Sequence, residues 1–232
     1  MEQKAKLKVN LPTKITISRI IVAFLLIVTI VVLYIVDQFN PFIINFNIEL
    51  NNNGATINWL MIILFVVFLI ASFTDFLDGY LARKNNQVTD LGKFLDPIAD
   101  KMLINGMMIF LALNFSSLGE SLKFPFFCVI IMEIRDLIVD GLRFMAATKH
   151  TVIAANIFGK LKTVLQMVAI SFVFINGWPF SYFDATWMPY LHITDFICYA
   201  ATIVSVLSGA IYLIQNKSVF LGQNNDSKWR IS

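Results

Sequence analysis

Three long apolar runs without a charged side chain constrain this chain most. They are Ile20–Val36, Asn51–Thr74, which is apolar from Ile57 onward, and Phe196–Asn216. A helix needs roughly 20 predominantly apolar residues to cross the hydrocarbon core of a bilayer. Of the 232 residues, 58% are hydrophobic and only 14% are charged, whereas a soluble domain carries ~25% charged residues. A soluble domain of this length cannot bury so much apolar surface, so we predict a membrane protein.

Three further apolar runs are too short or too interrupted to cross a membrane alone. Met102–Leu113 and Val164–Ile175 are short, and Phe124–Met145 is broken by five charged residues: Glu133, Arg135, Asp136, Asp140 and Arg143. Each run reaches spanning length only when a polar half is included. The sequence therefore predicts an all-α integral membrane fold with six transmembrane helices, three of them half polar.

Lysine and arginine alternate between the predicted connections, as expected when they gather on cytoplasmic loops. The N-terminal arm holds five of them, whereas 37–56 and 176–193 hold none. This pattern predicts a multi-pass protein of the cytoplasmic membrane with both termini in the cytoplasm. We expect three parts: an N-terminal juxtamembrane, interfacial segment at 1–14, a six-helix domain at 15–216 and a cytoplasmic tail at 217–232.

Charge and cysteine content argue against other classes. The net charge is only +3 and the basic residues form no long run, so we expect no nucleic-acid partner. Cys128 and Cys198 both lie inside apolar stretches. Neither a disulfide scaffold nor a thiolate metal site is therefore supported.

The charges inside the predicted spans fall in the cytoplasmic halves of spans two to five. An ionised side chain inside a membrane helix costs roughly 2.5–3.5 kcal/mol on insertion scales, so each needs a partner, an ion or water. Several such charges together predict a polar cavity that opens to the cytoplasm, and the active site is expected to face that side.

The densest cluster of these charges covers 75–100 and reads DFLDGYLARKNNQVTDLGKFLDPIAD. On a helix that ends the second span, four residues share one face: Asp75, Asp78, Gly79 and Ala82. On the helix that opens the third span, three residues are spaced by four and share a face: Gly92, Asp96 and Asp100. The eight residues between Arg83 and Gly92 are short enough for an antiparallel pair, so the two faces can meet.

Four carboxylates brought together repel each other, and all can stay ionised only beside cations. Their oxygens suit Mg²⁺ or Mn²⁺, and two such ions can bridge a phosphoryl group and neutralise its charge. Gly79, Ala82 and Gly92 lack bulk, so a ligand can approach the helix backbones closely. The cluster predicts a two-ion site for a pyrophosphate-containing substrate.

This cluster resembles the signature of the CDP-alcohol phosphatidyltransferase family, D-x2-D-G-x2-A-R-x8-G-x3-D-x3-D. All eight specified positions match: Asp75, Asp78, Gly79, Ala82, Arg83, Gly92, Asp96 and Asp100. Taken singly, some have simpler explanations, since Asp96 could be a helix N-cap before Pro97 and Arg83 could be a topology signal. Eight positions at fixed spacing favour the family.

The resemblance implies that an alcohol attacks the β-phosphorus of CDP-diacylglycerol and releases CMP. It implies that Asp75, Asp78 and Asp96 are the main metal ligands, and that Asp100 is the general base and also contacts a metal. It places eight residues near the CDP-lipid: Gly79, Ala82, Arg83, Thr89, Gly92, Asn10, Thr13 and Arg19. It also implies a homodimer.

Asn10, Thr13 and Arg19 belong to that set because 10–19 resembles the segment that precedes the first span in this family. Pro12 and Thr16 match recurring positions of the same segment. For Thr13 and Thr16, an interfacial helix anchored by lysines is an equally good explanation.

A second group of charges concerns the acceptor alcohol. Arginine forks and lysine charges suit phosphate oxygens, which predicts an acceptor phosphate bound by four residues: Arg135, Arg143, Lys160 and Lys162. The alternatives are structural ion pairs inside the membrane with Glu133, Asp136 and Asp140, or topology charges at the two lysines.

The segments GKFLDPIADK, RDLIVDGLR and GKLKT are most similar to the bacterial phosphatidylglycerophosphate synthase branch, whose acceptor is sn-glycerol 3-phosphate. This implies the formation of phosphatidylglycerophosphate and CMP. The chain departs from the branch at Asp136, where glutamate is expected, and at Glu133 and Asp140. Sibling enzymes that make phosphatidylinositol phosphate, cardiolipin or phosphatidylserine therefore remain alternatives. A transporter is disfavoured because the first and sixth spans are nearly uncharged.

Overall fold

The computed structural model describes residues 11–40, 47–49, 56–84, 90–115, 123–148, 157–178 and 192–217. The chain divides into two compact units. The first unit comprises Met1–Lys123 and Ile170–Tyr182, and the second comprises Phe124–Ala169 and Phe183–Ser232.

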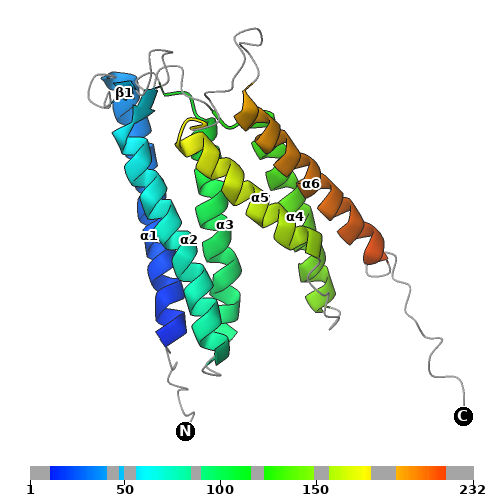
Figure 1. Ribbon diagram of the computed structural model, residues 1–232. Helices are drawn as coiled ribbons and strands as arrows, with labels where there is room; N and C mark the ends of the chain where they lie inside the picture. The colour runs from blue at the N-terminus through cyan, green and yellow to red at the C-terminus, as the bar shows by residue number, and fades with distance from the viewer. Residues whose placement is uncertain are drawn as a thin grey trace, which may run out of the picture. The chain divides into compact units, whose positions relative to one another are not determined.

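The first unit is built on three long helices, α1 (Leu11–Phe39), α2 (Trp59–Lys84) and α3 (Asp90–Ala112). Successive helices run in opposite directions, so the end of α2 and the start of α3 lie at the same end of the unit as the start of α1 (Figure 1). α1 packs along both α2 and α3, whereas α2 and α3 touch each other less extensively. The antiparallel α2–α3 pair predicted from the sequence is present, with α1 packed on both of its helices.

A short antiparallel ribbon joins α1 to α2. β1 (Asn47–Glu49) pairs with β2 (Thr56–Asn58), and Ile48 lies opposite Ile57. At the start of α2, Asn58 Oδ1 accepts a hydrogen bond from the backbone N–H of Leu60 at 2.8 Å and so satisfies one free donor of the first turn. The all-helical fold predicted from the sequence is otherwise confirmed, with six helices in the described part of the chain.

α3 begins before Asp96, which excludes the interpretation of Asp96 as the N-cap of this helix. Pro97 lies inside the helix, which starts at Asp90. Asp96 therefore cannot be an N-cap followed by a first-turn proline, and that alternative is wrong.

An aromatic cluster forms part of the core of the first unit. The Phe174 ring lies 5.6 Å from the ring of Phe65, 6.1 Å from that of Phe68 and 6.2 Å from that of Phe110, measured between centroids. Phe174 closes the last turn of α5 (Ile157–Phe174), and the part of this helix from Ile170 onward belongs to the first unit. Buried aromatic pairs at these separations add to the energy of area burial.

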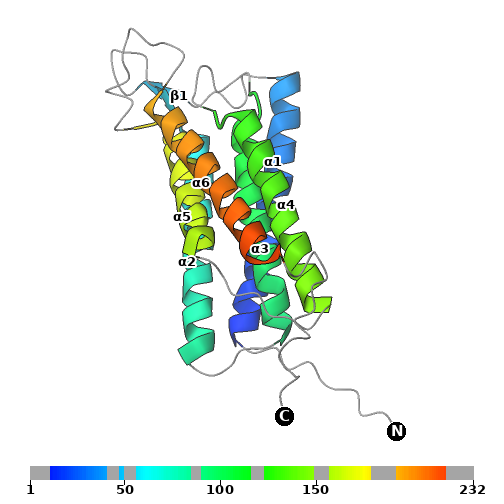
Figure 2. The ribbon, with the colours of Figure 1, turned by 90° about the vertical axis from the view of Figure 1, so that its right-hand side faces the viewer.

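The second unit contains α4 (Phe126–Thr148), the first part of α5 and α6 (Ile193–Gln215). α4 and α6 pack together extensively (Figure 2). Small side chains dominate the buried face of α6, among them Ala201, Ser205, Ser208 and Gly209. Small residues let two helix backbones approach closely, which is how membrane helices associate.

Among the described residues, three stretches are long and apolar enough to cross a membrane: Thr13–Phe39, Ile157–Phe174 and Ile193–Gln215. α5 reaches this length with its two lysines included, as predicted for a half-polar span. The apolar part of α2, Trp59–Asp75, is shorter. Phe24 and Leu25 of α1 are each 56% exposed. Exposing apolar side chains of this size costs free energy in water but not against the hydrocarbon of a lipid bilayer. The chain is a membrane protein, and the count of six spans stays a prediction.

Candidate active site

The acidic residues of the predicted signature lie on the helices that the sequence indicated. α2 is helical through Asp75 and continues to Lys84, and α3 covers Gly92, Asp96 and Asp100. The helical repeat therefore gives the predicted faces on both helices.

One buried arginine joins the two acidic helices. Arg19 of α1 donates from Nη1 to Asp100 Oδ1 at 2.8 Å, and the same nitrogen forms an ion pair with Asp75 Oδ1. The Arg19 side chain is fully buried, whereas the side chains of Asp75 and Asp100 are 36% and 45% exposed. Because one nitrogen contacts both, the two carboxylates converge on a buried charge while each stays partly exposed to solvent.

α1 also contacts the remaining described aspartate of the signature. Thr16 Oγ1 donates to Asp96 Oδ1 at 2.9 Å. Thr16 and Arg19 are three residues apart, on one face of α1, and Thr13 is buried three residues earlier. Gly92, one turn before Asp96, is buried as well.

Sequence reasoning assigned Arg19 to the CDP-lipid and did not foresee that α1 supplies partners to the aspartates. The sequence feature that could have indicated these contacts is the three-residue spacing of Thr13, Thr16 and Arg19, just before a long apolar run.

Several predicted residues cannot be placed. Asn10 and Thr89 lie outside the described residues. Four others have a described backbone position on α2 but no described side chain: Asp78, Gly79, Ala82 and Arg83.

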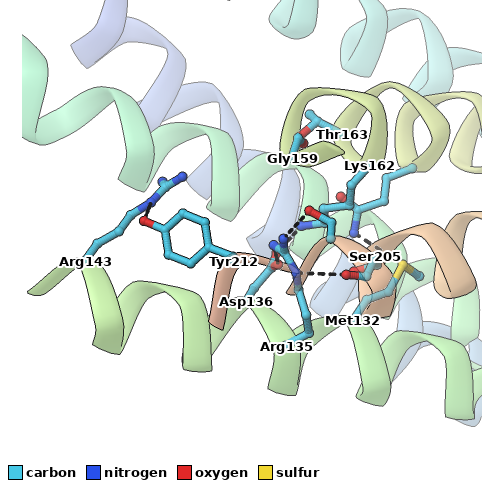
Figure 3. Close-up of polar contacts among 11 residues, drawn as sticks. Met132, Arg135, Asp136, Arg143, Gly159, Lys162, Thr163, Ser205 and Tyr212 are labelled. Carbon is cyan, nitrogen blue, oxygen red and sulfur yellow. Dashed lines mark hydrogen bonds and ion pairs between the residues drawn. The ribbon is translucent and has the colours of Figure 1, made fainter. Parts of the chain in front are cut away.

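A second polar group lies in the second unit, centred on Asp136 of α4 (Figure 3). Asp136 Oδ1 accepts a hydrogen bond from Arg135 Nη1 at 2.9 Å, and its Oδ2 forms an ion pair with Lys162 Nζ of α5. Asp136 and Lys162 are only 7% and 6% exposed. The predicted acceptor residues Arg135 and Lys162 thus share one buried carboxylate, which is one of the partners that the ion-pair alternative named.

α6 supplies the other contacts of Arg135. Its Nε donates to the backbone oxygen of Ser205 at 3.0 Å, and Nη2 donates to Ser208 Oγ at 2.8 Å. Sequence reasoning noted a weaker family resemblance at Ser208, Gly209 and Tyr212 in the sixth span, but it did not foresee their contacts with Arg135 and Arg143.

The other two predicted acceptor residues are exposed. Arg143 donates from Nε to the hydroxyl of Tyr212 at 3.2 Å, and its Cζ lies 5.6 Å from the centroid of the same ring (Figure 3). Lys160 lies in the first turn of α5. Of the four predicted cations, Lys162 is buried and Arg135 half-buried in an ion-pair network, whereas Arg143 and Lys160 are exposed.

Comparison with known proteins decides the family. Residues 9–214 match the model of the CDP-alcohol phosphatidyltransferase family. The chain belongs to this family. The match includes α1, α2, α3, α4 and α5, and all but the last residue of α6.

Three curated relatives share one printed name, CDP-diacylglycerol–glycerol-3-phosphate 3-phosphatidyltransferase. The Bacillus subtilis (strain 168) protein is 34% identical over 207 residues, which cover 89% of this chain and 95% of the relative. The Mycoplasma pneumoniae protein is 36% identical over 212 residues, covering 89% and 87%. The Mycoplasma genitalium protein is 42% identical over 158 residues, which cover 64% of this chain and 61% of that relative.

The donor set of this phosphatidyltransferase fits the divalent cation on which its family generally depends. Asp75 and Asp100 offer hard oxygen donors and already converge on one positive nitrogen, so the site accommodates positive charge. In the part of the chain whose side chains are described, no three potential ligands are grouped closely enough to hold a metal ion. Asp78 is the one signature aspartate whose side chain is not among those described.

Proposed function

We propose that the protein transfers a phosphatidyl group from CDP-diacylglycerol to sn-glycerol 3-phosphate, forming phosphatidylglycerophosphate and CMP. The observation that carries the proposal is the complete eight-position signature on α2 and α3, with Asp75 and Asp100 converging at Arg19. The choice of acceptor is supported by the printed names of the curated relatives.

In this reaction the acceptor hydroxyl oxygen forms a bond to the β-phosphorus of the CDP-lipid. The bond from that phosphorus to the oxygen of CMP breaks, and CMP leaves with the electron pair. Asp100 accepts the proton of the attacking hydroxyl. Arg19 holds the Asp100 carboxylate in place while leaving it accessible.

We assign cation binding to Asp75, Asp78 and Asp96, with Asp100 as a further ligand. Two bound Mg²⁺ or Mn²⁺ ions would offset the negative charge of the pyrophosphate and of departing CMP. Around them, Gly79, Ala82 and Gly92 leave room for the nucleotide, and Arg83, Thr89, Asn10 and Thr13 contact the CDP moiety.

The acceptor's own phosphate is assigned to the cationic group of the second unit: Arg135, Arg143, Lys160 and Lys162. A guanidinium fork matches two phosphate oxygens, and lysine adds charge without fixed geometry. The lipid's acyl chains stay in the bilayer, so the site lies at membrane depth and opens to the cytoplasm. The protein is expected to work in the cytoplasmic membrane as a homodimer, which light scattering in detergent can test.

An acceptor panel tests the proposal. Purified protein is incubated with labelled CDP-diacylglycerol, Mg²⁺ or Mn²⁺, and one of four acceptors: glycerol 3-phosphate, inositol phosphate, serine or phosphatidylglycerol. We expect CMP release with glycerol 3-phosphate, abolished by EDTA and restored by the divalent ion.

Asp96→Ala serves as the inactive control in the panel. Release of CMP with another acceptor and none with glycerol 3-phosphate would overturn the assigned acceptor and keep the reaction type. No CMP release with any acceptor would overturn the proposed reaction.

A further inference from the structure

Arg135 lies directly against the backbone of α6 at a glycine. A Cβ built on Gly209 would lie 2.8 Å from Cγ and 3.1 Å from Nε of Arg135. Real Cβ atoms essentially never approach other atoms as closely as the first distance. Any larger residue at this position would therefore displace the Arg135 side chain at its stem.

The close approach at Gly209 sets the direction in which the Arg135 guanidinium points. It brings the Arg135 guanidinium onto two oxygens of α6, the backbone oxygen of Ser205 and the hydroxyl of Ser208, while Asp136 holds it from α4. A guanidinium has five N–H donors. Three are used by these contacts, which leaves one on Nη1 and one on Nη2 without a partner among the described residues.

An arginine held on three sides with one donor remaining on each terminal nitrogen is suited to bind an anion. Its orientation is set before the ligand arrives, so less conformational entropy is lost on binding. The side chain is 13% exposed, so it is neither sealed off nor free to reorient in solvent.

We propose that Ser208 and Gly209 are positioning residues for the acceptor: they hold Arg135 in the orientation from which its two remaining donors bind the acceptor's phosphate. This inference rests on the proposed function, because it assumes an acceptor that carries a phosphate. It adds two residues of α6 that act through Arg135 and do not touch the substrate.

Gly209→Ala tests the inference with a matched control. Gly141→Ala makes the same substitution on α4, where a Cβ would meet nothing within 4 Å. Both proteins are purified, checked by thermal melting, and assayed for kcat and for the KM of each substrate. For Gly209→Ala we expect the KM for glycerol 3-phosphate to rise by roughly tenfold or more, in line with the loss of a hydrogen-bonded charge contact.

Comparing the change in KM for the two substrates distinguishes a loss of positioning at the acceptor site from a general loss of active-site structure. The KM for CDP-diacylglycerol should change by less than about twofold, and Gly141→Ala should match the wild type in all constants. A folded Gly209→Ala protein with an unchanged KM for glycerol 3-phosphate would overturn the inference. An equal rise in both KM values, or a fall in kcat alone, would overturn it as well.

Ser208→Ala carries the same test if Gly209→Ala fails to fold. It removes the hydroxyl that accepts from Nη2 and adds no volume, so the same selective rise in KM is expected, and its absence counts against the proposal.

The wild-type acceptor panel distinguishes this inference from the proposed function. A wild-type protein that uses a different phosphorylated alcohol overturns the assigned acceptor, and the two variants are then assayed with that alcohol under the same criteria. A wild-type protein that uses only an unphosphorylated acceptor overturns the positioning proposal as well.

Discussion

Arg19 is a buried cation whose charge is matched by two carboxylates on different helices. Burying a guanidinium is costly, and the cost is offset only when the charge is paired and hydrogen-bonded. Arg19 meets this condition with Asp75 and Asp100, while both aspartates stay partly exposed. One residue thus links the stability of the first unit to the geometry of its acidic site.

Replacing Arg19 with methionine should lower activity by at least roughly tenfold, because the two carboxylates then repel each other and leave their positions. Arg19→Lys should retain part of the activity, since it keeps the charge and loses the fork. Steady-state CMP release measures both. Lys14→Met is the control, because Lys14 is an exposed cation on the same helix. Equal activity of Arg19→Met and wild type would contradict the role given to Arg19.

Asp100→Asn should abolish turnover and largely spare binding of the CDP-lipid. Asparagine keeps the shape of the side chain and an oxygen that can accept from Arg19, but it cannot take the proton of the attacking hydroxyl. CMP release and equilibrium binding of labelled CDP-diacylglycerol report the two properties separately. Wild-type turnover in this variant would refute the assignment of Asp100 as the base.

At the scale of elements, the periodicity of α2 and α3 was predictable and the role of α1 was not. Residues spaced by three and four share a helix face whatever the helix packs on, so the acidic faces follow from sequence alone. The partners of Asp75, Asp96 and Asp100 lie 56, 80 and 81 residues away along the chain. No local pattern reports contacts of that separation.

In the second unit, Asp136 connects α4 to α5 through Lys162. Asp136→Ala should destabilise the fold by about 3 kcal/mol, because it leaves two cations in a buried site without their carboxylate. Thermal melting in detergent measures the loss. The double variant Asp136→Ala with Lys162→Met should recover part of it, since one stranded charge is removed. A single variant that melts at the wild-type temperature would show that the ion pair contributes nothing to stability.

At the scale of the whole molecule, exposed apolar side chains and the polar site lie at different positions along α1 and α2. α1 carries its buried Thr16 and Arg19 near its start and exposed apolar residues such as Phe24 and Val32 farther along. α2 has its apolar stretch before Asp75. Arg19 and the signature aspartates therefore gather at one end of the first unit, as an active site at the surface of a membrane requires.

Reporter fusions test the predicted orientation of the chain in the membrane. With six spans and both termini in the cytoplasm, a fluorescent protein fused to either end should mature and fluoresce, and alkaline phosphatase fused to either end should stay inactive. An active phosphatase fusion at one end only would indicate an odd number of spans and would refute the predicted topology.

The sequence by itself determined the membrane class, the acidic signature with its two helix faces, and the cations of α4 and α5. These features depend on composition and on spacing within one helix, which are local properties. Only the tertiary structure decided that Arg19 and Thr16 partner the aspartates, that Asp136 pairs with Arg135 and Lys162, and that Gly209 makes room for Arg135. Those results depend on which helix faces meet, and packing between distant segments determines that.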